Sequence, residues 1–325
     1  MTIKTLCVLG GGGFIGRRVV ALLAARGCRV RVPSRRREGA KALLVLPNVE
    51  VVEADIHDPA TLRVLFSGMD AVINLVGILH ETAAGRVEPA KAQRGSFRHA
   101  HVELPRKVVS ACRESGVDRL LHMSALGADT GSLSAYQRSK AEGEALVLAA
   151  DGDGLAVTVF RPSVVFGPGD SFLTMFADLL RLAPLVPLAD AAARFQPVYV
   201  GDVARAFADA MDMPETFGRA YALCGPQVYT LADLVRLTAR TLGLRRWVLP
   251  LGQAASYGFA RLMEMKPGTK IMTRDNHYAM LTDNVCPEGF PTLFGQATSL
   301  ESVIGYLHEA HPRRRYPGFR ARAGR

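Results

Sequence analysis

Near its start the chain reads Thr5-Leu6-Cys7-Val8-Leu9 and runs directly into Gly10-Gly11-Gly12-Gly13-Phe14-Ile15-Gly16. The first run predicts a buried strand, and the apolar repeat Ile15, Val19, Leu23 predicts a helix that follows the glycines. Glycines allow a tight turn and a close backbone approach to a pyrophosphate, whose charge the helix N-terminus stabilises. A purely structural glycine turn is the alternative, but the order of strand, loop and helix favours nucleotide binding.

The same alternation of strand-like and helical stretches continues to about residue 165. The run Ala71–Val76 lacks the apolar and polar alternation of a half-exposed strand, so it must be covered on both faces. We therefore expect an α/β fold of the Rossmann type, a doubly wound parallel sheet. The expected strands are 5–9, 28–32, 49–53, 71–76, 119–124 and 156–160, and the expected helices are 14–26, 59–67, 103–115 and 134–149.

Beyond Pro162 the sequence changes to proline-punctuated apolar stretches and then to helical patterns. We expect a Rossmann domain over 1–165, to which 196–211 returns, a smaller C-terminal α/β substrate or interaction region over 166–312, and a basic tail over 313–325. A chain of 325 residues with 49 % hydrophobic residues is long and apolar enough to bury such a core. Disordered and fibrous classes are excluded.

The net charge of +10 is largely a property of the tail. A basic tail can dock on anionic lipid or an acidic partner, or it can remain solvated. Elsewhere the sequence lacks the aromatic and basic interleaving that stacks bases, so we expect no nucleic-acid partner. The basic residues of the last 13 positions, which include no acid, are Arg313, Arg314, Arg315, Arg320, Arg322 and Arg325.

Cysteine usage indicates a reducing compartment. The five cysteines are far apart and form no Cys-x-x-Cys pair, which argues against a disulfide framework or a thiolate zinc site. No stretch of 18 uncharged apolar residues could span a membrane, so we expect a cytoplasmic protein. His308 and His311 miss the zinc-protease spacing by one residue, and His99 and His101 lack a third ligand nearby, so no metal site is expected.

The end of the second strand discriminates between the two nicotinamide cofactors. An acid there accepts from the ribose 2′-hydroxyl of NAD, but this chain reads Val32-Pro33-Ser34-Arg35-Arg36-Arg37. Guanidinium groups suit the 2′-phosphate of NADP, so we expect NADP(H) over NAD(H), with a solvated basic loop as the alternative. Asp55 and Ile56, just past the third strand, are placed to contact the adenine, although Asp55 could equally cap the next helix.

Tyr136 and Lys140 lie one turn apart on a predicted helix and so share a face. An ammonium beside a phenol favours the phenolate and can also bind the cofactor ribose, while the tyrosine delivers or removes a proton as hydride moves. Ser124, at the end of the fifth strand, could orient a substrate carbonyl. Alone, a Tyr-x-x-x-Lys pair usually marks an amphipathic surface; beside the glycine loop it indicates a dehydrogenase site.

Together these motifs resemble the extended and atypical short-chain dehydrogenase/reductase superfamily. The resemblance rests on Gly10-x-x-Gly13-x-x-Gly16, Asp55-Ile56, Ser124, Tyr136 with Lys140, and Arg161-Pro162-Ser163 followed by Phe166-Gly167-Pro168. The candidate cofactor contacts are Gly10, Gly13, Phe14, Ile15, Gly16, Arg35, Arg36, Asp55, Ile56, Leu75, Val76, Gly77, Tyr136, Lys140, Pro162 and Ser163, and the candidate catalytic residues are Tyr136, Lys140 and Ser124.

More narrowly, the chain resembles the NADPH-binding accessory subunit of respiratory complex I and its bacterial relatives. The matching stretches are His122 to Asp129, Arg161 to Pro168, Phe195 to Val200 and Met272 to Asn276. The resemblance implies a firmly held NADP(H) without established turnover, and a complex I partner or another membrane-associated complex. The protein would then lie peripherally on the inner face of the membrane, where the basic tail could add a contact.

One departure bears on catalysis. Active short-chain enzymes often place an asparagine in the fourth helix to hold a proton-relay water, and the matching region here is His99-Ala100-His101-Val102-Glu103. A histidine could relay a proton, so an active NADP-dependent oxidoreductase or epimerase on a small carbonyl or hydroxyl substrate stays open. The retained Tyr136, Lys140 and Ser124 favour the enzyme, but cofactor binding alone would need the same side chains.

Two further features receive structural interpretations. Asp202 is interpreted as the N-cap of a helix over 203–211. The apolar stretch 247–265 is expected to pack into the core, with a partner-binding or interfacial surface as the alternative. Its large apolar residues are Trp247, Leu249, Leu251, Tyr257, Phe259 and Leu262.

Overall fold

The computed structural model describes residues 3–81, 95–265 and 272–308. The chain forms two compact units. Within the described residues, the first unit contains the chain up to Ser163, Val200–Cys224 and Cys286–Gln296, and the second contains the segments between these and the residues after Gln296.

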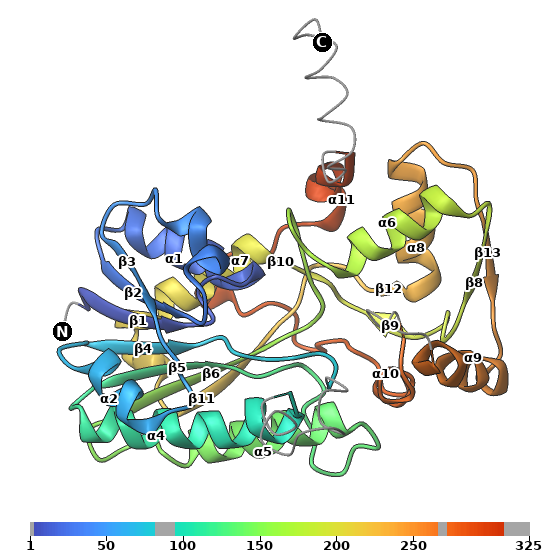
Figure 1. Ribbon diagram of the computed structural model, residues 1–325. Helices are drawn as coiled ribbons and strands as arrows, with labels where there is room; N and C mark the ends of the chain where they lie inside the picture. The colour runs from blue at the N-terminus through green and yellow to red at the C-terminus, as the bar shows by residue number, and fades with distance from the viewer. Residues whose placement is uncertain (1–2, 82–94, 266–271, 309–325) are drawn as a thin grey trace, which may run out of the picture. The chain divides into compact units, whose positions relative to one another are not determined.

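The first unit is built on a seven-stranded sheet of order β11-β6-β5-β4-β1-β2-β3 (Figure 1). Every pairing in this sheet is parallel. The strand order reverses between β1 and β4, which is the topological switch point of a Rossmann sheet and confirms the expected fold class. The strands are β1 (Thr5–Leu9), β2 (Arg29–Ser34), β3 (Val49–Glu53), β4 (Ala71–Asn74), β5 (Arg119–Met123), β6 (Ala156–Pro162) and β11 (Arg219–Leu223).

Helices cover both faces of this sheet (Figure 1). On one face lie α1 (Phe14–Ala25) and α7 (Val200–Asp209), and on the other lie α2 (Pro59–Phe66), α4 (Leu104–Glu114) and α5 (Ala135–Leu148). All four residues of β4 are buried, as expected for a strand that is covered on both sides. Leu62 of α2, Leu104 of α4 and Val157 of β6 are fully buried in the same cluster.

The second unit has short paired strands and helices around its own core. The parallel pairs are β7 (Val165–Phe166) with β10 (Val198–Tyr199) and β8 (Leu185–Leu188) with β13 (Trp247–Pro250); β9 (Arg194–Phe195) and β12 (Tyr229–Thr230) pair antiparallel. The helices are α6 (Phe172–Leu182), α8 (Leu231–Thr241), α9 (Gln253–Met265), α10 (Arg274–Met280) and α11 (Leu300–Val303). Phe166, Leu180, Leu234 and Leu307 are buried in its core.

The expectation that 247–265 packs into the core is wrong for most of its large apolar side chains. Trp247 is 79 % exposed, Leu249 50 % and Leu262 59 %. The reason is that β13 pairs with β8 alone and α9 fully buries only Ser256 and Ala260. The apolar pattern therefore marks an exposed surface of this unit.

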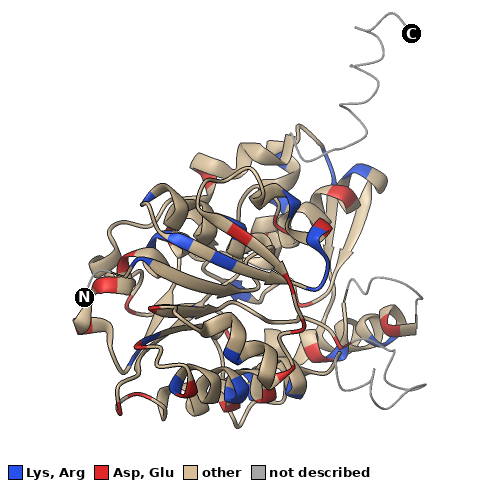
Figure 2. Cartoon of the chain, turned by 60° about the vertical axis from the view of Figure 1, so that its left-hand side comes forward, with Lys and Arg blue, Asp and Glu red and all other residues tan. Residues whose placement is uncertain are grey.

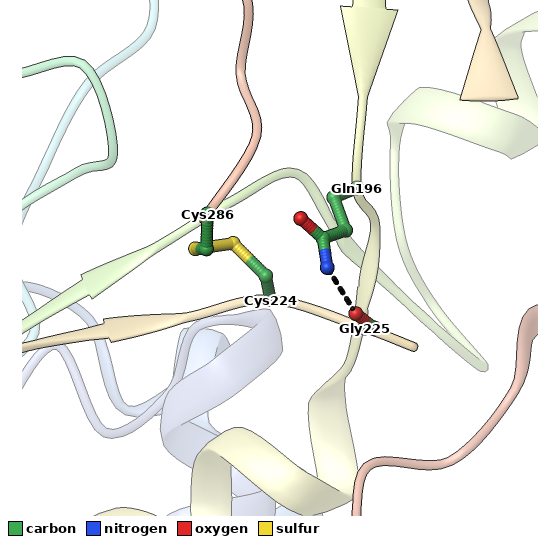
Figure 3. The surroundings of a disulfide bond; sticks show 4 residues. All are labelled: Gln196, Cys224, Gly225 and Cys286. Carbon is green, nitrogen blue, oxygen red and sulfur yellow. Dashed lines mark hydrogen bonds between the residues drawn. A yellow bond between two sulfur atoms is a disulfide. The ribbon is translucent and has the colours of Figure 1, made fainter. Parts of the chain in front are cut away.

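A disulfide joins Cys224 and Cys286, with their Cα atoms 6.1 Å apart (Figure 3). The expectation of unpaired cysteines was wrong, because 62 residues separate the partners and only the fold brings Cys286 back to the end of β11. Cys7, Cys28 and Cys112 are free. The inference of a reducing compartment rested on unpaired cysteines, so the disulfide removes its basis.

Basic and acidic positions are interspersed over the described elements (Figure 2). The tail 313–325, to which the sequence assigns much of the net charge, lies outside the described residues. Over the ranges 3–81, 95–265 and 272–308, no helix is both long and apolar enough to cross a membrane.

Candidate functional site

The candidate site follows one edge of the seven-stranded sheet. Because the strands are parallel, their carboxyl ends share this edge, and each candidate segment directly follows a strand. Along the edge, Pro162 and Ser163 end β6 and are followed by Ser124 after β5, Leu75–Gly77 after β4, Gly10–Gly16 after β1, Arg35 and Arg36 after β2, and Asp55 and Ile56 after β3.

The glycine loop lies at the switch point between β1 and β4. Gly10 has a φ of +77°, and a Cβ there would lie 3.2 Å from the Leu75 carbonyl carbon. A Cβ at Gly16 would lie 2.6 Å from the Cα of Gly11, so only glycine allows α1 to start this close to the loop. The N-cap of α1 is Gly13, and within the described chain no side chain caps it. The first N–H groups of Phe14, Ile15 and Gly16 thus face a backbone cradle of the kind that binds phosphate.

Arg35 and Arg36 lie between the end of β2 at Ser34 and a 3-10 helix that begins at Arg37. Both are exposed. A Cβ at Gly12 would lie 3.0 Å from the Gly39 carbonyl oxygen, which places this 3-10 helix against the glycine loop. The guanidinium groups are therefore close along the chain to the phosphate cradle.

Asp55 and Ile56 follow β3 and are half-buried. The Asp55 carboxylate accepts from the His57 backbone N–H at 3.0 Å. The alternative in which Asp55 caps the next helix is wrong, because Asp58 caps α2 by accepting from the backbone N–H groups of Ala60 and Thr61. Asp55 is thus not used as the cap.

Tyr136 and Lys140 lie one turn apart in α5, as expected. Lys140 Nζ donates to the Met123 carbonyl oxygen at 2.8 Å, which places the ammonium at the end of β5 beside Ser124. A Cβ at Gly77 would lie 3.5 Å from the same Nζ. The structure therefore brings Lys140 to the ends of β4 and β5, on the edge where the candidate residues lie.

Burial sets the charge state of Lys140. The side chain is 4 % exposed, and desolvation lowers its pKa from 10.5 to about 8, an effect that the nearby Glu144 carboxylate partly offsets. Glu144, buried one turn further along α5, accepts from Arg161 Nε at 2.8 Å and also from Arg161 Nη2. This network of charges, which the sequence did not reveal, fixes the helix face that presents Lys140.

Ser124 presents an unsatisfied polar atom. It is 3 % exposed, its backbone N–H donates to the Phe160 carbonyl, and its Oγ is buried without a hydrogen-bond partner among the described residues. A buried hydroxyl normally has a partner. Such an atom fits a role in binding a ligand oxygen or nitrogen.

His101 has contacts that sequence reasoning missed. Its Nε2 accepts from the Ile78 N–H at 3.1 Å, and its Nδ1 lies 2.8 Å from Ser139 Oγ. The ring also packs edge-to-face on Tyr136, with 5.5 Å between the centroids. Ser139 lies between Tyr136 and Lys140 in sequence, which was the only available signal.

The interpretation of Asp202 as an N-cap is wrong. The helix α7 begins at Val200, so the buried Asp202 lies inside its first turn and pairs with Arg205 Nη2 at 2.9 Å. Among the residues that the structure describes, no group of three or more His, Cys, Asp or Glu side chains is arranged to hold a metal ion. His311 lies outside the described residues.

These features together fit a dinucleotide. A loop that leaves no room for a Cβ at Gly10 or Gly16, an N-terminus of α1 without a side-chain cap, and the unsatisfied Ser124 Oγ lie on one sheet edge. A pyrophosphate, with its charges and acceptor oxygens, would satisfy the first two. A nicotinamide or ribose group has the polar atoms to satisfy the third.

Comparison with known proteins agrees with this assignment. The model of the NAD dependent epimerase/dehydratase family matches residues 6–224, and the chain belongs to this family. The match covers the seven-stranded sheet and the candidate site. The resemblance inferred from the motifs is confirmed.

Curated relatives include NADH dehydrogenase (ubiquinone) 1 alpha subcomplex subunit 9, mitochondrial, of Rattus norvegicus. It is 31 % identical over 301 residues, which cover 88 % of this chain and 74 % of the relative. The ceramide reductase of Caulobacter vibrioides is 32 % identical over 199 residues, 61 % of this chain and 58 % of the relative. The UDP-glucose 4-epimerase structure of Thermotoga maritima has a TM-score of 0.70 at 20 % identity, covers 94 % of this chain and 98 % of its own, and thus shares the fold.

Proposed function

We propose that the chain binds NADP(H) along the carboxyl edge of its sheet and holds it as a structural cofactor. The observation that carries the proposal is the run Arg35-Arg36-Arg37 after β2, where an NAD-specific site has an acid. Exposed guanidinium groups can bind the 2′-phosphate in a bidentate way. The loop Gly10–Gly16 would hold the pyrophosphate, and Lys140 the nicotinamide ribose.

The proposed partner is respiratory complex I. Support comes from the relatives named as subunits of NADH dehydrogenase (ubiquinone), which match this chain over most of its length. A cofactor that stabilises a subunit need not be consumed, which agrees with the structural role. The proposal places the protein peripherally on the inner face of the membrane.

Titration of the nucleotide-free protein with NADPH and NADH by calorimetry tests the cofactor proposal. We expect NADPH to bind at least about tenfold more tightly, which corresponds to about 1.4 kcal/mol. Equal affinities, or tighter NADH binding, would overturn it. Copurification with the membrane complex at low salt tests the partner separately.

A second candidate function is an active NADP-dependent oxidoreductase or epimerase on a carbonyl or hydroxyl substrate. The buried, unsatisfied Ser124 Oγ favours it, and one relative is named a reductase. When bound, the cofactor supplies or accepts hydride. Tyr136 would hold or release the proton of the substrate oxygen, Lys140 would orient and charge-stabilise that step, and Ser124 would position the oxygen.

Steady NADPH oxidation in a screen of carbonyl compounds tests this second function. An enzyme should lose at least about a hundredfold of its rate on Tyr136→Phe, because the general acid is removed. Lack of turnover with every carbonyl class, from a protein shown to bind NADPH, would leave the structural role.

A further inference from the structure

We propose that His101 is a positioning residue: as a neutral Nδ1–H tautomer, its ring pins the loop after β4 to the helix that carries Tyr136 and Lys140, and it relays no proton. The inference deepens the proposed function and rests on it, since Leu75–Gly77 is one wall of the proposed nucleotide site.

The hydrogen bonds assign the tautomer. The Ile78 N–H donates to Nε2 at 3.1 Å, so Nε2 carries no proton and the neutral ring must carry its proton on Nδ1. Nδ1 then donates to Ser139 Oγ at 2.8 Å, and Ser139 Oγ–H donates to the Tyr136 carbonyl at 2.8 Å. A second proton on Nε2 would face the Ile78 N–H and break that bond. The chain of donors is therefore complete in one direction.

The surroundings keep the ring neutral. His101 is 2 % exposed and stacks on Phe97 with 5.6 Å between the centroids. Burial, and secondarily the ammonium of Lys140, lower its pKa to about 3. Its other titratable neighbour, His122, is also fully buried with a pKa well below the usual value. A cation at His101 would thus be uncompensated.

The backbone serves the same placement. His101 lies in a π-helical turn, His99–Glu103, which leads into α4. Such turns are rare and concentrate at functional sites. From this turn the ring reaches Ser139 and Tyr136 of α5 and the backbone of Ile78, so one side chain links three segments of the site.

The hypothesis that a histidine relays a proton here therefore does not hold for His101. Both ring nitrogens are engaged, and neither can take up a proton without losing a bond that holds the site. A pinned loop instead favours slow exchange of a bound nucleotide. The network connects Gly77, the wall of the site, to the helix that presents Lys140.

Nitrogen-15 NMR of the nucleotide-free protein with labelled histidine tests the tautomer without any turnover. We expect the His101 ring to show the Nδ1–H form and not to titrate between pH 5 and 9. Titration near the ordinary histidine value of about 6.5, or the Nε2–H form, would overturn the proposal. This readout stands even if the chain binds no NADPH, which would refute the proposed function instead.

Release of labelled NADPH from three variants tests the pinning. His101→Leu should speed release about tenfold, and His101→Asn, whose amide can donate and accept, should recover most of the loss. The matched control is His99→Gln, two residues away in the same turn, because His99 bonds Glu103 and not the loop. Thermal melts verify that each variant is folded. Equal release from the His101→Leu and His99→Gln variants, or no rescue by asparagine, would contradict the proposal.

Discussion

The cofactor preference is decided by single side chains at the end of β2. Arg35 and Arg36 are exposed there, beside the 3-10 helix that packs on the glycine loop. Because charge-assisted bonds to a phosphate contribute about 1.5–3 kcal/mol, Arg36→Glu should weaken NADPH binding about tenfold to a hundredfold and leave NADH binding nearly unchanged.

Calorimetric titration of both nucleotides measures that change. Arg63→Ala serves as the control, because Arg63 is an arginine of the same unit that pairs with Glu114 on the helical face of the sheet. If Arg36→Glu weakened NADH and NADPH equally, the arginines would contribute only a diffuse field.

Lys140 illustrates a conflict between stability and binding at one residue. Its pKa falls from 10.5 to about 8 in the folded state, so below pH 8 folding must bury an ammonium that the unfolded chain solvates. The cost is therefore present at pH 7 and fades as the pH rises from 8 toward 10.5. Lys140→Met should stabilise the nucleotide-free protein by about 2 kcal/mol at pH 7 and weaken nucleotide binding.

Denaturant unfolding at pH 7 and pH 10 checks the sign of this effect. The advantage of the variant should shrink at the higher pH, where the wild-type lysine is neutral when folded. A variant that is less stable at pH 7 would mean that the bond to the Met123 carbonyl outweighs the buried charge.

At the scale of elements, the junction of β1 and α1 leaves no room for a larger residue at Gly16. A Cβ there would lie 2.6 Å from the Gly11 Cα and 2.8 Å from its carbonyl carbon. Backbone cannot move aside as a flexible side chain can, so Gly16→Ala should cost about 2–4 kcal/mol and abolish nucleotide binding.

Thermal unfolding with and without NADPH measures both effects. Gly258→Ala in α9 is the matched control, because its Cβ would meet nothing within 4 Å and alanine favours helix. A Gly16→Ala protein of normal stability that still binds NADPH would remove the glycine loop from the site.

The elements of the nucleotide-binding half could be predicted because their apolar periodicity is local. The predicted strand 5–9 and helix 14–26 match β1 and α1 to within a residue. The predicted strand 71–76 was too long, because the chain leaves the sheet after Asn74 to form the wall of the site. The edge strand Arg219–Leu223 was missed, since it joins the sheet only by pairing with β6, 57 or more residues earlier in the chain.

The site itself was only partly predictable. Glycine spacing and the Tyr136 and Lys140 pair announce their chemistry locally. The pairing of His101 with Ile78 and of Glu144 with Arg161 depends on which elements become neighbours, and a single sequence does not report that. The placement of each predicted residue is now known, but its role in binding is a proposal.

For the whole molecule, the disulfide marks where the chain passes between its two units. Cys224 is the last residue of one segment of the first unit, and Cys286 is the first residue of the next. Gln196 donates from Nε2 to the Gly225 carbonyl at 2.7 Å, and from its backbone to the Asn284 carbonyl at 3.0 Å (Figure 3). Both ends of the intervening loop are therefore fixed by covalent and hydrogen bonds.

Removing this bond should destabilise the protein. For a loop closed across 62 residues, chain entropy gives an upper value of about 4 kcal/mol. Denaturant unfolding of a variant with Cys224→Ser and Cys286→Ser should show a loss of this order or less. Without reductant, alkylation in denaturant should label only Cys7, Cys28 and Cys112; labelling of all five cysteines would contradict the disulfide.

The central claim is that this molecule holds NADP(H) as a structural cofactor. The most direct measurement is to purify the protein gently, release its nucleotide with acid and base, identify it, and follow exchange of the intact complex against labelled NADPH. We predict one NADP(H) per chain that exchanges over hours. A chain that carries NAD(H), or an empty site that exchanges NADPH within seconds, would contradict the claim.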